Sequence, residues 1–130
     1  MTRFVHLHVH TEYSLVDGVV RVESEHKDGK LAREGLIDAC VRLGMPAVAL
    51  TDQANLFALV KFYRAAQSAG VKPLVGVDAL VHEDAERAEP SRLVLLCQDE
   101  VGYRNLTRLV TRCYLEGQGR HGPTLRRDWL

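Results

Sequence analysis

Short, continuous apolar runs alternate with amphipathic helical patterns along this chain. Three of the runs are typical of buried strands, namely residues 47–51, 74–81 and 93–97. Apolar residues recur at helical spacing in three further segments, namely residues 31–43, residues 56–69 and the stretch between Asp99, a suitable N-cap, and Gly117. Strands that alternate with helices favour parallel pairing and right-handed crossovers. We therefore expect an α/β fold with parallel strands and the helices outside.

The segment from Phe4 to Gly18, FVHLHVHTEYSLVDG, places three histidines at alternating positions. In an extended strand, His6, His8 and His10 share one face. A lone histidine on a strand is most often solvated or satisfied within the core, whereas three in a row beside the carboxylate of Asp17 match the usual ligands of zinc, manganese or iron. A metal site and a structural face both remain open. His8 and His10 lie nearest the carboxyl end of the strand, where barrels hold their chemistry, and His6 is expected to be deeper and structural.

Two further carboxylates lie at positions that suggest a role. Asp52 follows the apolar run 47–51 directly, at the carboxyl end of an expected strand. Asp78 interrupts the run 74–81, and a carboxylate within a buried strand is costly unless it is paired or coordinates an ion. Both acids are therefore candidates for the same site. Residues 83–91 are charged and lack periodicity, so we expect a solvated loop there, and residues 119–130 show no recognisable element.

The composition narrows the functional class. The chain has 130 residues, the size of one small domain, and its 17 basic and 17 acidic side chains cancel, so no strongly basic nucleic-acid surface is evident. The three widely spaced cysteines, Cys40, Cys97 and Cys113, indicate reduced thiols in a cytoplasmic protein. The sequence shows neither an apolar signal core near its start nor an apolar stretch approaching 18 residues, so we expect no membrane association.

The number of strands is too small for a closed barrel. The histidine strand and the three apolar runs make four, and an unclosed sheet leaves an unpaired edge and uncovered apolar surface. We therefore expect residues 1–130 to be the beginning of a longer domain. On its own, the 130-residue chain should be poorly soluble or molten.

Three segments resemble one known family. HLHVHTEYSLVDG, GMPAVALTDQANLFALVKFYRAAQSAGVKPLVGVDALV and LCQDEVGYRNLTRLVTRCYLEGQG, with the ending GPTLRRDWL, strongly resemble the N-terminal PHP (polymerase and histidinol phosphatase) domain of the alpha subunits of bacterial DNA polymerase III, the C-family replicative polymerases. The resemblance implies a distorted (β/α)7 PHP barrel, of which residues 1–130 supply roughly the first half. It also implies a parent chain that is a DNA-directed DNA polymerase using Mg²⁺, with its catalytic aspartates outside these residues, so no polymerase catalytic residue is expected here.

The same resemblance implies a set of metal ligands. PHP domains that keep their site are similar to metal-dependent phosphoesterases, in which Zn²⁺ or Mn²⁺ is held by histidines and acids. Matched positions are His8, His10, Asp17, Asp52 and Asp78. Two positions depart from the pattern, because Gln53 and Arg92 stand where the family has histidine. Arg92 could pair with Asp78 or Asp17 and so replace the charge of an ion.

These departures favour a site that has decayed, with at most one weakly bound ion. The resemblance then implies a structural module that docks the proofreading exonuclease subunit and other replicase subunits, with DNA bound through the parent chain. The alternative is a phosphoesterase or 3′–5′ exonuclease activity retained in the PHP site. A stand-alone phosphatase is disfavoured, because the similarity extends through VGYRNLTRLV and RDWL and is not confined to the metal motifs.

Overall fold

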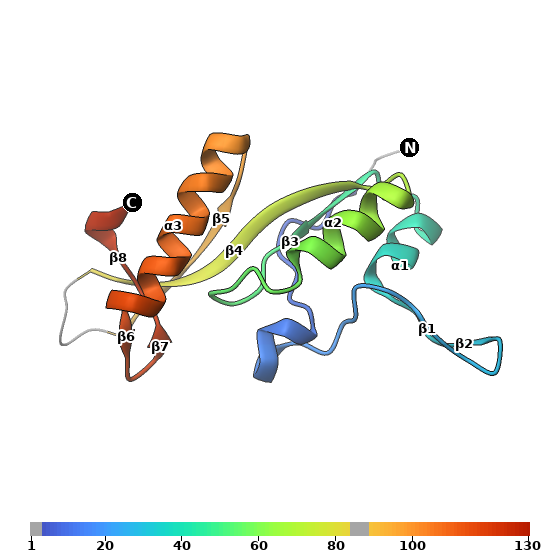
Figure 1. Ribbon diagram of the computed structural model, residues 1–130, viewed down its shortest axis with the longest axis horizontal. Coiled ribbons are helices and arrows are strands. Elements are labelled where there is room, and N and C mark those ends of the chain that lie inside the picture. The colour runs from blue at the N-terminus through green and yellow to red at the C-terminus, as the bar shows by residue number, and fades with distance from the viewer. Residues whose placement is uncertain (1–3, 84–88) are drawn as a thin grey trace.

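A long central strand organises the molecule, and three other strands and two helices pack against it (Figure 1). The computed structural model describes residues 4–83 and 89–130. The helical elements are the 3-10 segment η1 (Glu12–Asp17), α1 (Leu36–Arg42), α2 (Leu59–Ser68), α3 (Glu100–Glu116) and the 3-10 turn η2 (Arg127–Trp129). The strands are β1 (Glu25–Lys27), β2 (Lys30–Arg33), β3 (Ala47–Leu50), β4 (Lys72–His82), β5 (Ser91–Leu96), β6 (Gln118–Gly119), β7 (Gly122–Pro123) and β8 (Leu125–Arg126).

The α/β class is confirmed, and the pairing of the strands is mixed. β4 pairs in parallel with β3 at its start and with β8 at its end. β5 pairs with β4 in antiparallel register, Asp78 opposite Val94, so the expectation of parallel strands was wrong for β5. The reason is the connection: only residues 83–90 separate β4 from β5, which is shorter than the dozen or more residues that a parallel crossover requires.

The histidine segment lies beside β3 and forms little regular ladder. His6 makes an isolated parallel bridge with Val48, and the carbonyls of His6 and Val9 accept hydrogen bonds from Ala49 N–H (2.9 Å) and Thr51 N–H (3.0 Å). His6 itself is exposed, so its expected deep position was wrong. The segment is nevertheless extended along β3, and this carries His8 and His10 to the carboxyl end of that strand.

Helix α1 is shorter than the sequence pattern suggested. Lys30–Arg33 is a strand, β2, because Asp28 (φ 51°) and Gly29 (φ 73°) adopt the left-handed turn that joins two hairpin strands. The helix expected over residues 31–43 therefore begins only at Leu36. The third helix follows the prediction, since Asp99 accepts a hydrogen bond from Gly102 N–H (2.8 Å) and Gly117 ends it.

Two separate cores lie on either side of the molecule, and β4 lines the second core and pairs at its start with β3 of the first. The first joins α1, α2 and β3 around Phe62 and Val48, both completely buried. The second joins α3, β4 and β8 around Val77, Leu106 and Leu125. Figure 1 shows the two helical groups at opposite ends of β4. Each core is small, and the pairing of β3 with β4 connects them.

The carboxyl-terminal residues are more ordered than the sequence suggested. They form the β6–β7 hairpin and then β8, whose Leu125 is 2% exposed and pairs with Val81. Arg112 of α3 stacks over the ring of Trp129 at 4.1 Å. The expectation that this segment lacks an element was wrong, because its apolar residues are too few to show a period but suffice to cover one end of β4. The charged loop predicted at 83–91 includes residues 84–88, which lie outside the described residues.

None of the helices in the described part of the chain has the length and apolar character needed to span a bilayer.

The burial of Cys113 in the second core predicts that its thiol reacts slowly. Burial raises the pKa of the Cys113 thiol from 9.0 to about 11, so the thiolate fraction near pH 8 falls about 100-fold. We expect iodoacetamide to label Cys113 about 100-fold more slowly in the native, intact polypeptide than in urea, as followed by mass spectrometry. Equal rates in the two conditions would show that α3 does not pack on β4 as described.

Candidate metal centre

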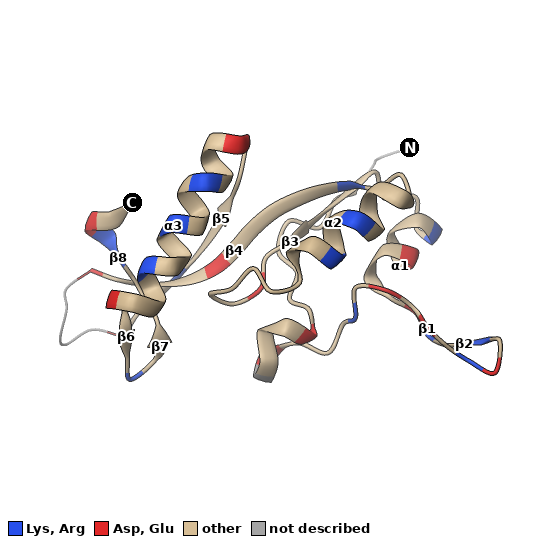
Figure 2. Ribbon diagram, in the orientation of Figure 1, with Lys and Arg blue, Asp and Glu red and all other residues tan. Residues whose placement is uncertain are grey.

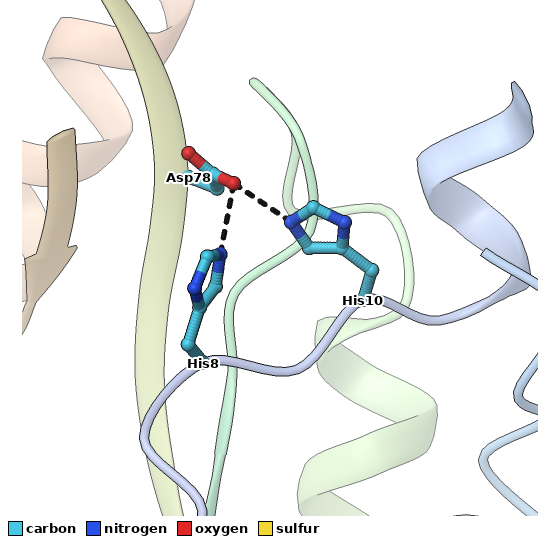
Figure 3. Close-up of side chains that lie close together, drawn as sticks. All are labelled: His8, His10 and Asp78. Atoms are coloured by element: carbon cyan, nitrogen blue, oxygen red, sulfur yellow. Dashed lines mark hydrogen bonds and ion pairs between the residues drawn. The ribbon is translucent and has the colours of Figure 1, made fainter. Parts of the chain in front are cut away.

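The candidate centre is formed where the histidine segment crosses β4. His8 and His10 come from the extended segment beside β3, and Asp78 comes from the middle of β4 (Figure 3). The backbone of Asp78 is held by the segment that follows β3, because its N–H donates to Asp52 O (3.0 Å) and its carbonyl accepts from Ala54 N–H (2.9 Å). The carboxylate is 1% exposed and therefore has to be satisfied within the protein.

The two imidazoles converge on one carboxylate oxygen. His8 Nε2 lies 2.9 Å and His10 Nε2 lies 2.8 Å from Asp78 Oδ2 (Figure 3). Because a carboxylate oxygen accepts hydrogen bonds, both rings donate from Nε2. Within the described residues, these three side chains are the group whose ligand atoms could surround an ion, with all of them within 4.8 Å of one another. The set of two imidazoles and one carboxylate suits Zn²⁺ or Mn²⁺.

Two charged side chains complete the cluster. Asp17 Oδ2 lies 3.3 Å from His10 Nδ1. Arg92 of β5 places Nη1 3.3 Å from Asp78 Oδ2 and Nη2 3.6 Å from Asp17 Oδ2, as the sequence suggested. One oxygen of Asp78 thus has three nitrogen donors around it, and the guanidinium bridges both carboxylates. A metal ion at this site would therefore lie close to the positively charged guanidinium of Arg92.

The loop that carries Asp17 has little freedom. A Cβ on Gly18 would lie 2.0 Å from the carbonyl oxygen of Thr11, so the chain can close this loop only with glycine there. Glu12 N–H also donates to Val20 O at 2.9 Å, which ties the two ends of the loop together. Asp17 is therefore held near His10 by the backbone, although its own side chain is 51% exposed.

Asp52 lies apart from this cluster. It is completely buried, and its oxygens accept hydrogen bonds from Thr11 N–H (2.6 Å), Thr11 Oγ1 (2.8 Å) and Ser14 Oγ (2.7 Å). Asp52 matches a ligand position of the family, but here its carboxylate already accepts hydrogen bonds from the loop after the histidines. Sequence reasoning missed Thr11 and Ser14, although two hydroxyl residues three apart just after the histidines were the available signal.

Gln53 lies beside Asp78, with which it forms an isolated parallel bridge. Its backbone N–H donates to Ser14 Oγ (3.1 Å) and its carbonyl accepts from Asn55 Nδ2 (3.0 Å). The residue lines a cavity of about 340 Å³ together with Asp78, Tyr114 and others. Gln53 therefore adjoins the candidate centre through its backbone.

Comparison with known proteins identifies the family. The PHP domain model matches residues 6–130. The chain belongs to the PHP domain family. Among curated relatives of this PHP chain, DNA polymerase III subunit alpha of Pseudomonas aeruginosa is 47% identical over 127 residues and that of Xylella fastidiosa is 44% identical over 131 residues. The subunit of Escherichia coli K12 is 43% identical over 128 residues.

The PHP chain spans about a tenth of the length of these relatives. Each alignment covers 98% of this chain but 10% or 11% of the relative. A solved structure with the same fold is an amidohydrolase from Chromobacterium violaceum, with bound sulfate and no metal. It matches with a TM-score of 0.60 and 22% identity, over 88% of this chain and 34% of that one. At this identity the likeness shows the fold alone.

Proposed function

We propose that this PHP domain belongs to the alpha subunit of a bacterial replicative DNA polymerase. The support is the 43% to 47% identity to proteins named DNA polymerase III subunit alpha over nearly the whole chain. In this proposal the parent polypeptide extends DNA primers with Mg²⁺, and the nucleotidyl transfer takes place outside residues 1–130. The free cysteines Cys40, Cys97 and Cys113 suit the reducing cytoplasm where such a polymerase works.

Within that polypeptide, the domain itself has a structural role and docks the proofreading exonuclease and other replicase subunits. The observation that carries this proposal is the position of Arg92, which bridges Asp78 and Asp17. A guanidinium at this position offsets part of the negative charge of the two carboxylates and repels a metal cation. The cluster therefore links the histidine segment, β4 and β5 without an ion, and the site serves as a cross-link.

A retained phosphoesterase or 3′–5′ exonuclease activity is the second candidate. The observation in its favour is the convergence of His8, His10 and Asp78, which could hold one ion. Metal ions in such sites supply Lewis acidity toward phosphoryl oxygens. Among residues 4–83 and 89–130 little is left for a second ion, since Asp52 is committed to Thr11 and Ser14. One ion beside a fixed guanidinium is a poor basis for hydrolysis.

Metal analysis of the intact polypeptide separates the two candidates. After mild chelation and reloading with Zn²⁺ or Mn²⁺, we expect less than one tightly bound ion per PHP domain. The double substitution Arg92→His and Gln53→His places histidine at both positions where this chain departs from the family. We expect it to tighten Zn²⁺ binding by about 10 to 100-fold, because it removes a positive charge and adds two imidazoles. Arg92→Gln is the matched control, because it removes the charge without adding a ligand.

A different result would overturn the structural proposal. Two or more ions bound by the unaltered domain, with Mn²⁺-dependent hydrolysis of DNA ends that is lost on His8→Ala, would replace the structural proposal with the enzymatic one.

A further inference from the structure

A single residue, Val9, separates the two histidines of the candidate centre, and Thr51 holds it by both of its backbone polar groups. Val9 N–H donates to Thr51 Oγ1 (2.8 Å). The Val9 carbonyl accepts from Thr51 N–H (3.0 Å) and from Thr51 Oγ1 (3.1 Å). One hydroxyl can make both contacts, because it donates one hydrogen bond and accepts others. Thr51 is completely buried directly after β3, so the backbone between the histidines is fixed to the end of that strand.

The position of Val9 determines where both neighbouring rings point. Val9 packs against the first core, and side chains alternate along an extended chain, so His8 and His10 face away from that core. Both rings meet Asp78 instead (Figure 3). Apart from Lys72 at its start, β4 carries one charged residue, Asp78, which is the acidic position in the middle of the strand in Figure 2. A slip of one residue along β3 would turn both rings away from this carboxylate.

The methyl group of Thr51 lies against β4. A Cβ added to Gly76 would be 3.1 Å from Thr51 Cγ2, so glycine at this position leaves room for the methyl group. Gly76 and Asp78 are two residues apart on β4 and therefore share one face of the strand. The side chain of Thr51 thus meets the histidine segment through its hydroxyl and β4 through its methyl group.

We propose that Thr51 is a positioning residue that sets the register and the separation between the two histidines and Asp78. The inference rests on the proposed role of the cluster as a cross-link, and it names the residue that aligns the parts of that cross-link. Two substitutions separate the contributions of the side chain. Valine keeps the shape of threonine but leaves Val9 N–H without its partner, whereas serine keeps the hydroxyl and loses only the methyl group.

Labelling of His10 by diethyl pyrocarbonate in the intact polypeptide tests this role. The side chain of His10 is 13% exposed within the cluster. We expect Thr51→Val to raise its labelling rate about 10-fold or more, because the segment then opens locally. With Thr51→Ser the rate should stay within about twofold, because the hydroxyl is kept. His26 in the β1–β2 hairpin is exposed, serves as the internal reference and should react equally in all variants.

Thr124→Val is the matched control. Thr124 is also buried, 5% exposed, and its hydroxyl donates to the carbonyl of Gly117 (2.9 Å), away from the histidines. This substitution removes a buried hydroxyl and its hydrogen bond as Thr51→Val does, yet it should leave the labelling of His10 unchanged. An equal rise for both variants would indicate a general loss of stability and overturn the positioning role. An unchanged rate with Thr51→Val would overturn it as well.

A second readout uses the variant designed to bind metal. Added to Arg92→His with Gln53→His, Thr51→Val should weaken Zn²⁺ binding by about 10 to 100-fold, the usual effect of losing a group that orients metal ligands. Thr51→Ser should not weaken it, and an unchanged affinity with Thr51→Val would contradict the positioning role. A tightly bound ion in the unaltered polypeptide would overturn the ion-free cross-link instead. The labelling rate of His10 would still decide the role of Thr51.

Discussion

Replacement of Asp52 by alanine should lower the free energy of unfolding of this domain by about 3–5 kcal/mol. The carboxylate accepts from Thr11 N–H, Thr11 Oγ1 and Ser14 Oγ, all in the buried connection between the histidine segment and β3. Removing it leaves these donors without partners, at about 1–3 kcal/mol for each buried group. Hydrogen exchange of residues 47–56 in the intact polypeptide measures the loss, as a fall in protection of about 100-fold or more.

A matched acid at the surface should behave differently. Asp128 is 63% exposed and, among the described residues, pairs with Arg126 two positions earlier, so Asp128→Ala should change stability by less than about 0.5 kcal/mol. If Asp52→Ala were as mild as Asp128→Ala, the three hydrogen bonds would not hold the histidine segment in place. His8 and His10 would then need another explanation for their convergence on Asp78.

The 130-residue chain on its own should show no sharp cooperative thermal transition. Its two small cores are separate and are connected by the pairing of β3 with β4, and large apolar side chains remain uncovered, among them Val19 (83% exposed), Leu115 (78%) and Leu15 (76%). Uncovered apolar surface and an open sheet favour a molten, aggregating state. Differential scanning calorimetry together with near-ultraviolet circular dichroism measures this directly. A single narrow transition with an intact near-ultraviolet spectrum would contradict it.

Several parts of the fold and site were predictable because they depend on local sequence. Helix α3 begins after Asp99, whose carboxylate caps it, and ends at Gly117. Asp78 was marked as unusual by its charge within an apolar run. The pairing of Arg92 with Asp78 followed from the need to neutralise a buried carboxylate where a ligand histidine is missing. In these cases one residue type in one context had few satisfactory arrangements.

The errors concern features that depend on distant partners. The antiparallel direction of β5 depends on the length of its connection, while the apolar run itself is the same for either direction. The hydrogen bonds of Asp52 could not be foreseen, because its donors, Thr11 and Ser14, lie about 40 residues away in the chain. Leu125 is buried only because β4 extends far enough to meet it. The spacing of apolar residues within a short segment of sequence carries no information about contacts with such distant residues.

The bridge made by Arg92 has a consequence for how the domain responds to its surroundings. A coordinated ion exchanges with the medium, so a fold that is tied together by one loosens when the supply of that metal falls. A guanidinium is covalently part of the chain and stays charged at every physiological pH. On the proposed structural role, the junction between the histidine segment, β4 and β5 is independent of the supply of zinc or manganese, and a chelator that opens a metal-held barrel would leave this junction closed.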